Sequence, residues 1–128
     1  MTISVTALYA AFFAIMFAAL RIHVSILRGK YDVSILHDNK MDLALRIRRH
    51  GNFNENVPYA IVLMLIAEAL GTPALWIHVM GLALVVSRVF HVISLDVENT
   101  ASPLRIIGGT IATAAMILNV GFIVAYAL

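Results

Sequence analysis

Residues 46–66 read RIRRHGNFNENVPYAIVLMLI, a polar run of bases, amides and one carboxylate that continues without a break into an apolar segment. The apolar half is typical of a membrane-spanning helix. Polar groups at membrane depth are costly, and they are retained where a ligand, a partner or a water-filled pocket meets them. The stretch therefore predicts both a membrane fold and a binding site at the start of one helix.

The composition of the chain favours a membrane protein with one domain. Of its 128 residues 62% are hydrophobic and 12% are charged, whereas a soluble domain is about half apolar and about one quarter charged. Such a chain is expected to form one compact unit of packed helices over residues 1–128. The lack of cysteine excludes disulfides, thiolate metal sites and a cysteine nucleophile. We expect no metal. We also expect no nucleic acid, because most of the bases behind the net charge of +2 cluster between Arg21 and Arg49, where they mark topology.

Four apolar stretches are long enough to cross the hydrocarbon core of a bilayer, which takes about 20 helical residues. They cover approximately residues 3–27, 42–70, 73–95 and 103–128. Residues typical of helix ends separate them: Gly29 with Lys30, Tyr31 and Asp32 after the first; Asp38, Asn39 and Asp42 before the second; Gly71, Thr72 and Pro73 between the second and third; Ser102 and Pro103 before the fourth. We predict an all-α integral membrane bundle of four transmembrane helices, with Thr72 and Ser102 as N-caps, each followed by proline in the first helical position.

Basic residues are concentrated around the first connection. It and its flanks contain Arg28, Lys30, Lys40, Arg46, Arg48 and Arg49, whereas the connection at residues 71–73 contains no charge. The positive-inside rule then places the first and third connections in the cytoplasm and both termini outside. Residues 1–20 carry no basic residue before their apolar run, so we interpret them as a retained first helix rather than a signal peptide.

The polar residues of the second stretch follow the period of a helix. At about 100° per residue, Arg48, Asn52, Glu55 and Tyr59 fall within roughly 60° of one another, so they form one stripe. Pro58 lies inside the same helix and has no N–H for the carbonyl four residues earlier, so a kink or a free acceptor is expected beside the stripe.

The other helices supply polar groups that we expect at the same depth. Arg21 and Arg28 share a face of the first helix, and Arg88 and His91 are one turn apart on the third. Arg105 lies in the first turn of the fourth helix, where the helix dipole adds positive potential. We predict that these groups converge on one cytoplasmic site.

A purely structural role is the alternative for several of these residues. Arg28, Arg46 and Arg49 are typical of side chains that snorkel to lipid headgroups. Arg21 and Arg88 could pair with Glu55 or with one another in a purely structural cluster. The sequence favours this role and ligand contact about equally. Near the other end of the second helix, Glu68 is interpreted as a residue of the membrane interface.

Three motifs resemble those of the MAPEG family, the membrane-associated proteins in eicosanoid and glutathione metabolism. The family pattern Arg-x-x-x-Asn-x-x-Glu-x-x-Pro is present as Arg48, Asn52, Glu55 and Pro58. The pair Arg88 and His91 is similar to the Arg-x-x-His of the prostaglandin E synthase branch, and Pro103-Leu104-Arg105 is similar to its Pro-x-Arg. The order, spacing and four-helix plan agree over essentially the whole chain.

The resemblance implies a homotrimer in a bacterial inner membrane, with glutathione bound between neighbouring subunits and open to the cytoplasm. A lipophilic second substrate would enter from the surrounding membrane lipids. The resemblance assigns residues as follows: Arg48, Asn52, Glu55, Arg88 and His91 contact glutathione, Arg21 or Arg28 contacts the tripeptide from the first helix, and Arg105 stabilises its thiolate as the catalytic residue. We include Tyr59, the last member of the stripe, in the binding set.

The residue types fit this ligand chemically. Glutathione carries two carboxylates and one ammonium, which arginine forks and one glutamate complement. A thiol has a pKa of about 8.5, and a nearby arginine at a helix N-terminus lowers that pKa enough to populate the nucleophile. We therefore predict a glutathione-dependent transferase or peroxidase that acts on lipophilic electrophiles or lipid hydroperoxides without a protein base.

Two positions depart from the prostaglandin synthase branch: Leu95 and Gly109 replace tyrosines. Their loss argues against a tyrosine that activates the thiol and leaves the arginine route. The principal alternative is a lipid- or glutathione-binding scaffold of the same family without catalysis. A haem-binding cytochrome that uses His23 and His91, or a small proton-coupled exporter, is a further alternative, although the first helix lacks the carboxylate that an exporter needs.

Overall fold

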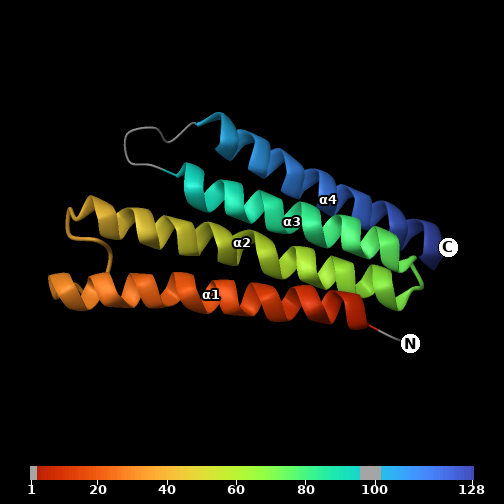
Figure 1. Cartoon of the computed structure of the whole chain (residues 1–128), viewed down its shortest axis with the longest axis horizontal. Helices are drawn as coiled ribbons and strands as arrows, with labels where there is room; N and C mark the ends of the chain where they lie inside the picture. The colour runs from red at the N-terminus through yellow and green to blue at the C-terminus, as the bar shows by residue number, and fades with distance from the viewer. Residues whose placement is uncertain (1–2, 96–101) are drawn as a thin grey trace.

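The computed structural model describes residues 3–95 and 102–128 as four helices joined by short connections (Figure 1). These are α1 (Ser4–Tyr31), α2 (Met41–Ala69), α3 (Ala74–Ser94) and α4 (Pro103–Ala127). All regular secondary structure in the described ranges is helical. The prediction of an all-α four-helix fold is therefore confirmed.

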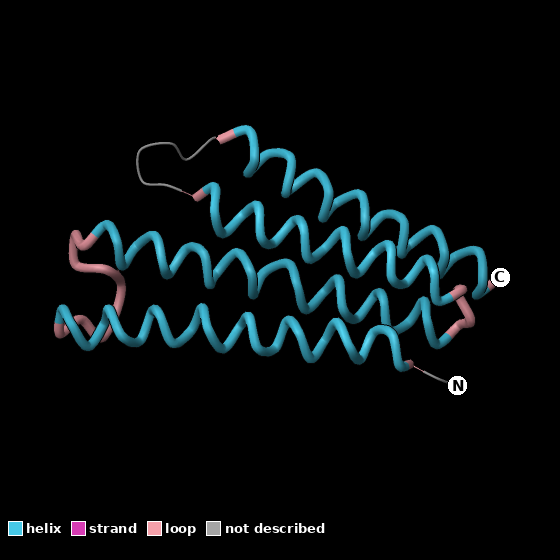
Figure 2. The backbone as a smooth tube through the Cα atoms, in the orientation of Figure 1, coloured by secondary structure: helices cyan, strands magenta, loops and turns pink. Residues whose placement is uncertain are grey.

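The helices lie side by side in a bundle (Figure 1). α2 contacts each of the other three helices, whereas α1 and α4 do not contact each other within the described residues. α1 ends and α2 begins at the same end of the bundle, which we call the basic end. All nine Lys and Arg residues lie in the connection at this end or in the half of a helix that is nearer to it. At this end α1 and α2 reach farther than α3 and α4, and both chain termini lie at the opposite end (Figure 2).

Three of the helices, α1, α3 and α4, are long and apolar enough to span a membrane. α2 has the polar run of residues 46–59 in its first half, which lowers its hydropathy although it is 29 residues long. Because α2 packs beside the three apolar helices, its polar run lies against the bundle, where side chains such as Arg48 and Glu55 remain about half exposed. The chain is an integral membrane protein, and its outward apolar side chains, such as Ile15, Ile93 and Ile117, are more than 60% exposed.

Two apolar clusters hold the helices together. The first surrounds Phe13, Phe53 and Leu84, and it includes an edge-on contact between the rings of Phe13 and Phe53 with centroids 6.0 Å apart. The second contains Met64 and Ile77 near the end opposite the basic end. Burying polar side chains in an apolar cluster would cost free energy. The aromatic cluster therefore determines which face of α2 turns toward α1, and the polar residues occupy another face of the helix.

α1 ends within the predicted segment of residues 29–32, whereas the start of α2 differs from the prediction. α1 continues through Gly29 to Tyr31 and ends at Asp32, whose φ of 54° is left-handed and whose N–H donates to the Arg28 carbonyl. The first helix therefore does not stop at its glycine, because Asp is one of the few other residues that tolerate this conformation. The N-cap of α2 is Lys40, which provides no side-chain cap, so the prediction of an Asp or Asn cap was wrong.

The connection between α2 and α3 is a tight turn. Gly71, with φ of 99°, follows α2 as predicted. Pro73 is the N-cap of α3, however, and the helix begins at Ala74, so Thr72 does not cap it. At α4 the prediction is confirmed, because the Ser102 hydroxyl accepts from the Arg105 amide at 3.4 Å.

Glu68 joins two helices at the end opposite the basic end. Its two carboxylate oxygens accept the backbone N–H groups of Val5 at 2.9 Å and Thr6 at 2.8 Å. These amides belong to the first turn of α1, which has no side-chain cap of its own. The residue interpreted as part of the membrane interface therefore caps α1 from α2, and its negative charge stabilises the positive end of the α1 dipole.

Candidate functional site

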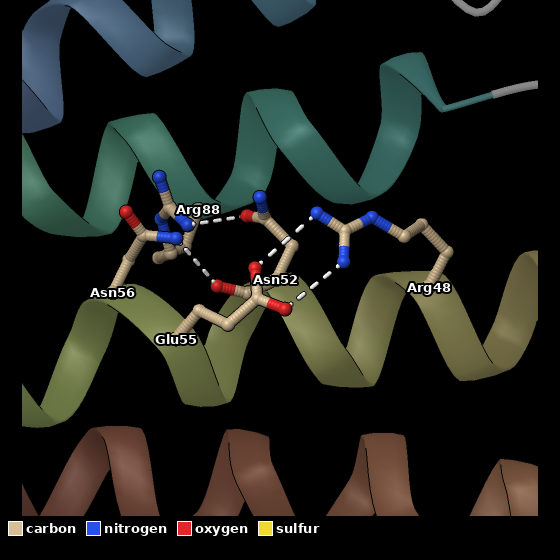
Figure 3. A network of polar contacts seen from close by, with 5 residues as sticks. All are labelled: Arg48, Asn52, Glu55, Asn56 and Arg88. Carbon is tan, nitrogen blue, oxygen red and sulfur yellow. Dashed lines mark hydrogen bonds and ion pairs between the residues drawn. The ribbon is translucent and has the colours of Figure 1, made fainter.

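The polar stripe of α2 carries a two-pronged ion pair. Arg48 donates from its two terminal nitrogens to the two carboxylate oxygens of Glu55, at 3.0 and 3.2 Å (Figure 3). The two residues are nearly two helical turns apart, which places both side chains on one face of the helix. Both remain about half exposed, at 50% and 58%, so water or a ligand can reach them.

Arg88 reaches the same place from α3 but is buried. Its side chain is 3% exposed, and its Nη1 donates to the Asn52 side-chain oxygen at 2.7 Å (Figure 3). Its Nε and Nη2 donate to the Ser87 hydroxyl at 3.3 and 2.8 Å. The predicted convergence of the α2 stripe with the α3 arginine is therefore present in this chain.

The Arg88 guanidinium is balanced only by neutral acceptors. Among the residues that the structure describes, no carboxylate lies within ion-pair distance of it, and Glu55 is engaged by Arg48. A buried cation without a counter-charge is costly, and the amide and hydroxyl oxygens offset only part of that cost. Of the five N–H groups of a guanidinium, three are used here. The arrangement retains positive charge and donors for an anionic group from outside.

α4 is held tightly against α3 at this level. The Ser87 hydroxyl donates to the Gly108 carbonyl at 2.7 Å. A methyl group at Gly108 would lie 3.0 Å from the Ser87 carbonyl oxygen and 3.2 Å from the Cβ of Phe90, so glycine permits the close approach. This contact brings the first turn of α4, three residues earlier, next to the end of α3.

His91 lies one turn beyond Arg88 and is 5% exposed. Its Nε2 has no hydrogen-bond partner among the described residues. The charges of four arginines act on its ring: Arg88, Arg105, Arg48 and Arg49. The arginines of three helices thus share the neighbourhood of one buried imidazole, and this neighbourhood is strongly electropositive.

Arg105 is half-buried in the first turn of α4 and stands at the head of a groove. The groove is open and runs along one face of α4 alone, away from the basic end, and its lining includes Gly109, Thr110 and Ile117. The position of a Cβ at Gly109 has no atom within 4 Å, so the groove is open there. Its mainly apolar walls suit a lipophilic molecule more than a water-soluble one.

Three of the predicted site residues do not join this cluster. Arg21 is exposed on α1, and Tyr59 is 71% exposed on α2. Arg28 donates to the Val33 carbonyl at 3.3 Å, in the connection that follows its own helix. The structure therefore brings together Arg48, Asn52, Glu55 and Arg88, places His91 beside them, and leaves these three apart.

The sequence interpretation missed three polar residues of this region. Ser87 received no role, although a small polar residue directly before a motif arginine in an apolar helix was an available signal. Asn56 donates to the Asn52 backbone carbonyl at 2.8 Å. Arg49, interpreted as a headgroup marker, donates to the Leu95 carbonyl at 2.8 Å and so caps the end of α3.

Comparison with known proteins identifies the family. The MAPEG family model matches residues 6–125. The chain is 37% identical over 87 residues to the inner membrane protein YecN of Escherichia coli K12 and to the protein of the same name in E. coli O6:H1 strain CFT073. The match covers 68% of this chain and 66% of each relative, so the chain spans about two thirds of their length. No solved structure matches at a significant level. Because the family model covers nearly all of the four-helix bundle, the chain belongs to the MAPEG family.

Proposed function

We propose that this protein binds glutathione at the basic end and is a glutathione-dependent transferase or peroxidase for lipophilic electrophiles or lipid hydroperoxides. One observation carries the proposal: the buried Arg88 guanidinium is held by neutral acceptors, beside a half-exposed Arg48–Glu55 pair. This arrangement suits a ligand that brings both negative and positive groups. Membership of a family that is named for glutathione metabolism supports the same ligand.

The charges of the site match glutathione group by group. A ligand carboxylate takes the remaining N–H groups of Arg88, and the second carboxylate takes Arg48. Glu55 then exchanges Arg48 for the ligand ammonium. Because the Arg48–Glu55 pair is about half exposed, its own contribution to stability is small, so the exchange costs little.

Arg105 is the residue that we assign to the thiol. It lies in the first turn of α4, where the positive end of the helix dipole and the guanidinium both favour an anion. Together they lower the pKa of the glutathione thiol and populate the thiolate without a protein base. The thiolate forms a C–S bond to an electrophilic carbon as the leaving group departs with its electron pair. With a hydroperoxide, two glutathione thiols are oxidised to one disulfide as the hydroperoxide is reduced to an alcohol and water.

The assembly and location belong to the same proposal. We expect a homotrimer in the inner membrane, where the relatives named YecN are found, with the basic end in the cytoplasm. Arg21 and Arg28 do not contact the cluster of their own subunit, which is consistent with a role in the site of a neighbour. The groove below Arg105 gives a lipophilic substrate a route from the bilayer toward the thiolate.

Titration calorimetry in detergent tests the binding step. We expect glutathione to bind in the millimolar range or tighter, and a protein that shows no binding there would refute the proposal. The thiolate absorbance of the bound ligand tests the role of Arg105. Arg105→Ala should lose most of that absorbance and at least tenfold in turnover, whereas full retention of both would remove Arg105 from the chemistry.

A binding scaffold without catalysis is the second candidate. Two positions favour it, since Leu95 is a buried apolar residue and Gly109 has no side chain, so neither supplies a hydroxyl to the thiol. Glutathione binding with no conjugation or peroxide reduction across a panel of lipophilic substrates would support the scaffold. Measurable turnover of any of them would exclude it.

A further inference from the structure

We propose that Ser87 is a positioning residue, which holds Arg88 ready for one carboxylate of the ligand and ties it to α4. The inference rests on the proposed function, because it assigns Arg88 to a ligand carboxylate. It goes beyond the motif residues, since Ser87 lies outside all three motifs. The argument begins with the bonds of a single hydroxyl.

All the bonding capacity of the Ser87 hydroxyl is used. A hydroxyl has one proton to donate and two lone pairs to accept with. Because a guanidinium has no acceptor, the Ser87 proton goes to the Gly108 carbonyl at 2.7 Å, and both lone pairs face Arg88. The side chain is 0% exposed, so water does not compete for these bonds. The direction of every bond at this oxygen is therefore determined.

These bonds restrict the guanidinium plane from one side, and Asn52 restricts it from the other. Ser87 holds the Nε and Nη2 of Arg88, while Asn52 of α2 accepts from Nη1. Two points of attachment on a planar group leave it little freedom to turn. One N–H group remains on each terminal nitrogen, and we assign these two donors to the ligand carboxylate. A side chain that is already ordered loses less entropy when the ligand binds.

Ser87 also connects Arg88 to α4. Its bond to Gly108 lies one turn after Arg105, on the helix that carries the residue assigned to the thiol. The close approach of the two helices at Gly108 makes this a short and rigid connection. The carboxylate-binding arginine and the thiol-binding arginine are thereby held on one unit of α3 and α4, so the distance between two ends of the same ligand is set.

The competing explanation is that Ser87 only joins two helices. Loss of its bond to Gly108 would then weaken packing and reduce the affinity for every ligand alike. A positioning role predicts a selective loss instead, confined to ligands that carry the carboxylate bound by Arg88. The two monoesters of glutathione, each with one carboxylate blocked, separate these possibilities.

The experiment measures the affinity of the full-length protein in detergent for glutathione and for both monoesters. We expect Ser87→Ala to bind glutathione roughly tenfold more weakly, about the effect of one charge-assisted hydrogen bond. It should bind one monoester as well as the unsubstituted protein does, because that ester lacks the carboxylate that Arg88 takes. Equal losses for all three ligands, or no loss for any, would overturn the positioning role.

Two further variants complete the test. Ser87→Cys nearly preserves the side-chain shape and replaces the hydroxyl by a weak acceptor, so it should show the same selectivity even if the alanine variant folds poorly. Thr6→Val removes another buried hydroxyl, at the opposite end of the bundle, and should leave all three affinities unchanged. If the unsubstituted protein bound no glutathione, the proposed function and the role of Ser87 would both be wrong. Binding by that protein with an unselective Ser87→Ala would reject Ser87 alone.

Discussion

Arg48 and Arg88 show two ways of keeping a cation in a membrane bundle. Arg48 is half exposed and paired with a carboxylate, whereas Arg88 is buried among neutral oxygens. The first arrangement costs little to form or to break, and the second is costly because a buried charge has no counter-charge beside it. At the scale of single residues, the site therefore combines an exchangeable ion pair with a fixed guanidinium.

The exchangeable pair leads to a prediction for Glu55. Glu55→Gln should weaken glutathione binding by roughly tenfold, because the ligand ammonium loses its counter-charge, and it should not change the affinity for N-acetylated glutathione, which has no ammonium. The free energy of unfolding should change by about 0–1 kcal/mol, because both partners are half exposed. Calorimetry and thermal unfolding in detergent give the two quantities.

The matched control for Glu55 is the other glutamate of α2. Glu68 lies at the opposite end of the bundle, and its carboxylate bonds to the first turn of α1. The Glu68→Gln variant should therefore leave the affinity for glutathione unchanged. Equal weakening of glutathione and its N-acetylated form in Glu55→Gln would show that the carboxylate does not bind the ammonium.

Residue periodicity predicted part of this site. The spacing of Arg48, Asn52 and Glu55 was enough to put them on one face of α2. It could not show that Glu55 pairs with Arg48 while Asn52 pairs with Arg88, because the choice of partner depends on the rotation of α3 against α2. Ser87 was missed for the same reason, since its role exists only after α3 and α4 meet at Gly108.

At the scale of helices, close contacts are set by small residues. A methyl group at Gly81 of α3 would lie 2.5 Å from the ring of Tyr9 on α1. That ring cannot easily move, because its hydroxyl is held by the Nδ1 of His78 at 3.1 Å and by the His78 carbonyl at 3.2 Å. Gly81 therefore determines how near α1 lies to α3, in a contact that hydrophobic periodicity does not reveal.

A pair of glycine substitutions tests this contact. Gly81→Ala should destabilise the bundle by about 1–3 kcal/mol, the usual cost of an overpacked core. Gly29→Ala should be neutral or stabilising by up to about 1 kcal/mol, because Gly29 lies within α1 with nothing within 4 Å of the added methyl group. Thermal unfolding in detergent compares the two, and equal effects would contradict the assigned contact.

Helix ends were predicted with mixed success for a physical reason. Ser102 and Gly71 act through their own backbone neighbours, so their local sequence was sufficient. The cap of α1 comes instead from Glu68, 62 residues away from Thr6, and no local pattern shows such a partner. The N-cap of α3 is Pro73, one residue after the predicted Thr72, and a difference of one residue is within the usual uncertainty of a helix boundary.

At the scale of the whole molecule, composition and the four apolar runs were sufficient to predict the fold. In a bilayer, backbone groups are satisfied within each helix, so four such runs lead almost directly to four helices. The order of packing was not predictable in that way. α2 contacts all three other helices, which keeps its polar run beside them, and only the three-dimensional arrangement shows this (Figure 1).

The proposed trimer gives the last prediction, because it divides the site between subunits. Arg21 and Arg28 do not contact the Arg88 cluster in their own subunit, so in a trimer they are expected to serve a neighbour. The variant R21A/R28A and the variant R88A should each bind glutathione poorly as pure assemblies. A mixed trimer, however, has one interface at which an intact Arg88 faces an intact first helix.

Co-expression of the two variants with different affinity tags, followed by tandem purification, isolates these mixed trimers. They should recover glutathione binding at one site per trimer, with an affinity close to that of the unsubstituted protein. Native mass spectrometry checks both the number of subunits and the number of bound ligands. A site complete within one subunit predicts a different result: R21A/R28A alone would bind normally, and mixing would add nothing, since each R88A subunit would stay defective beside any neighbour.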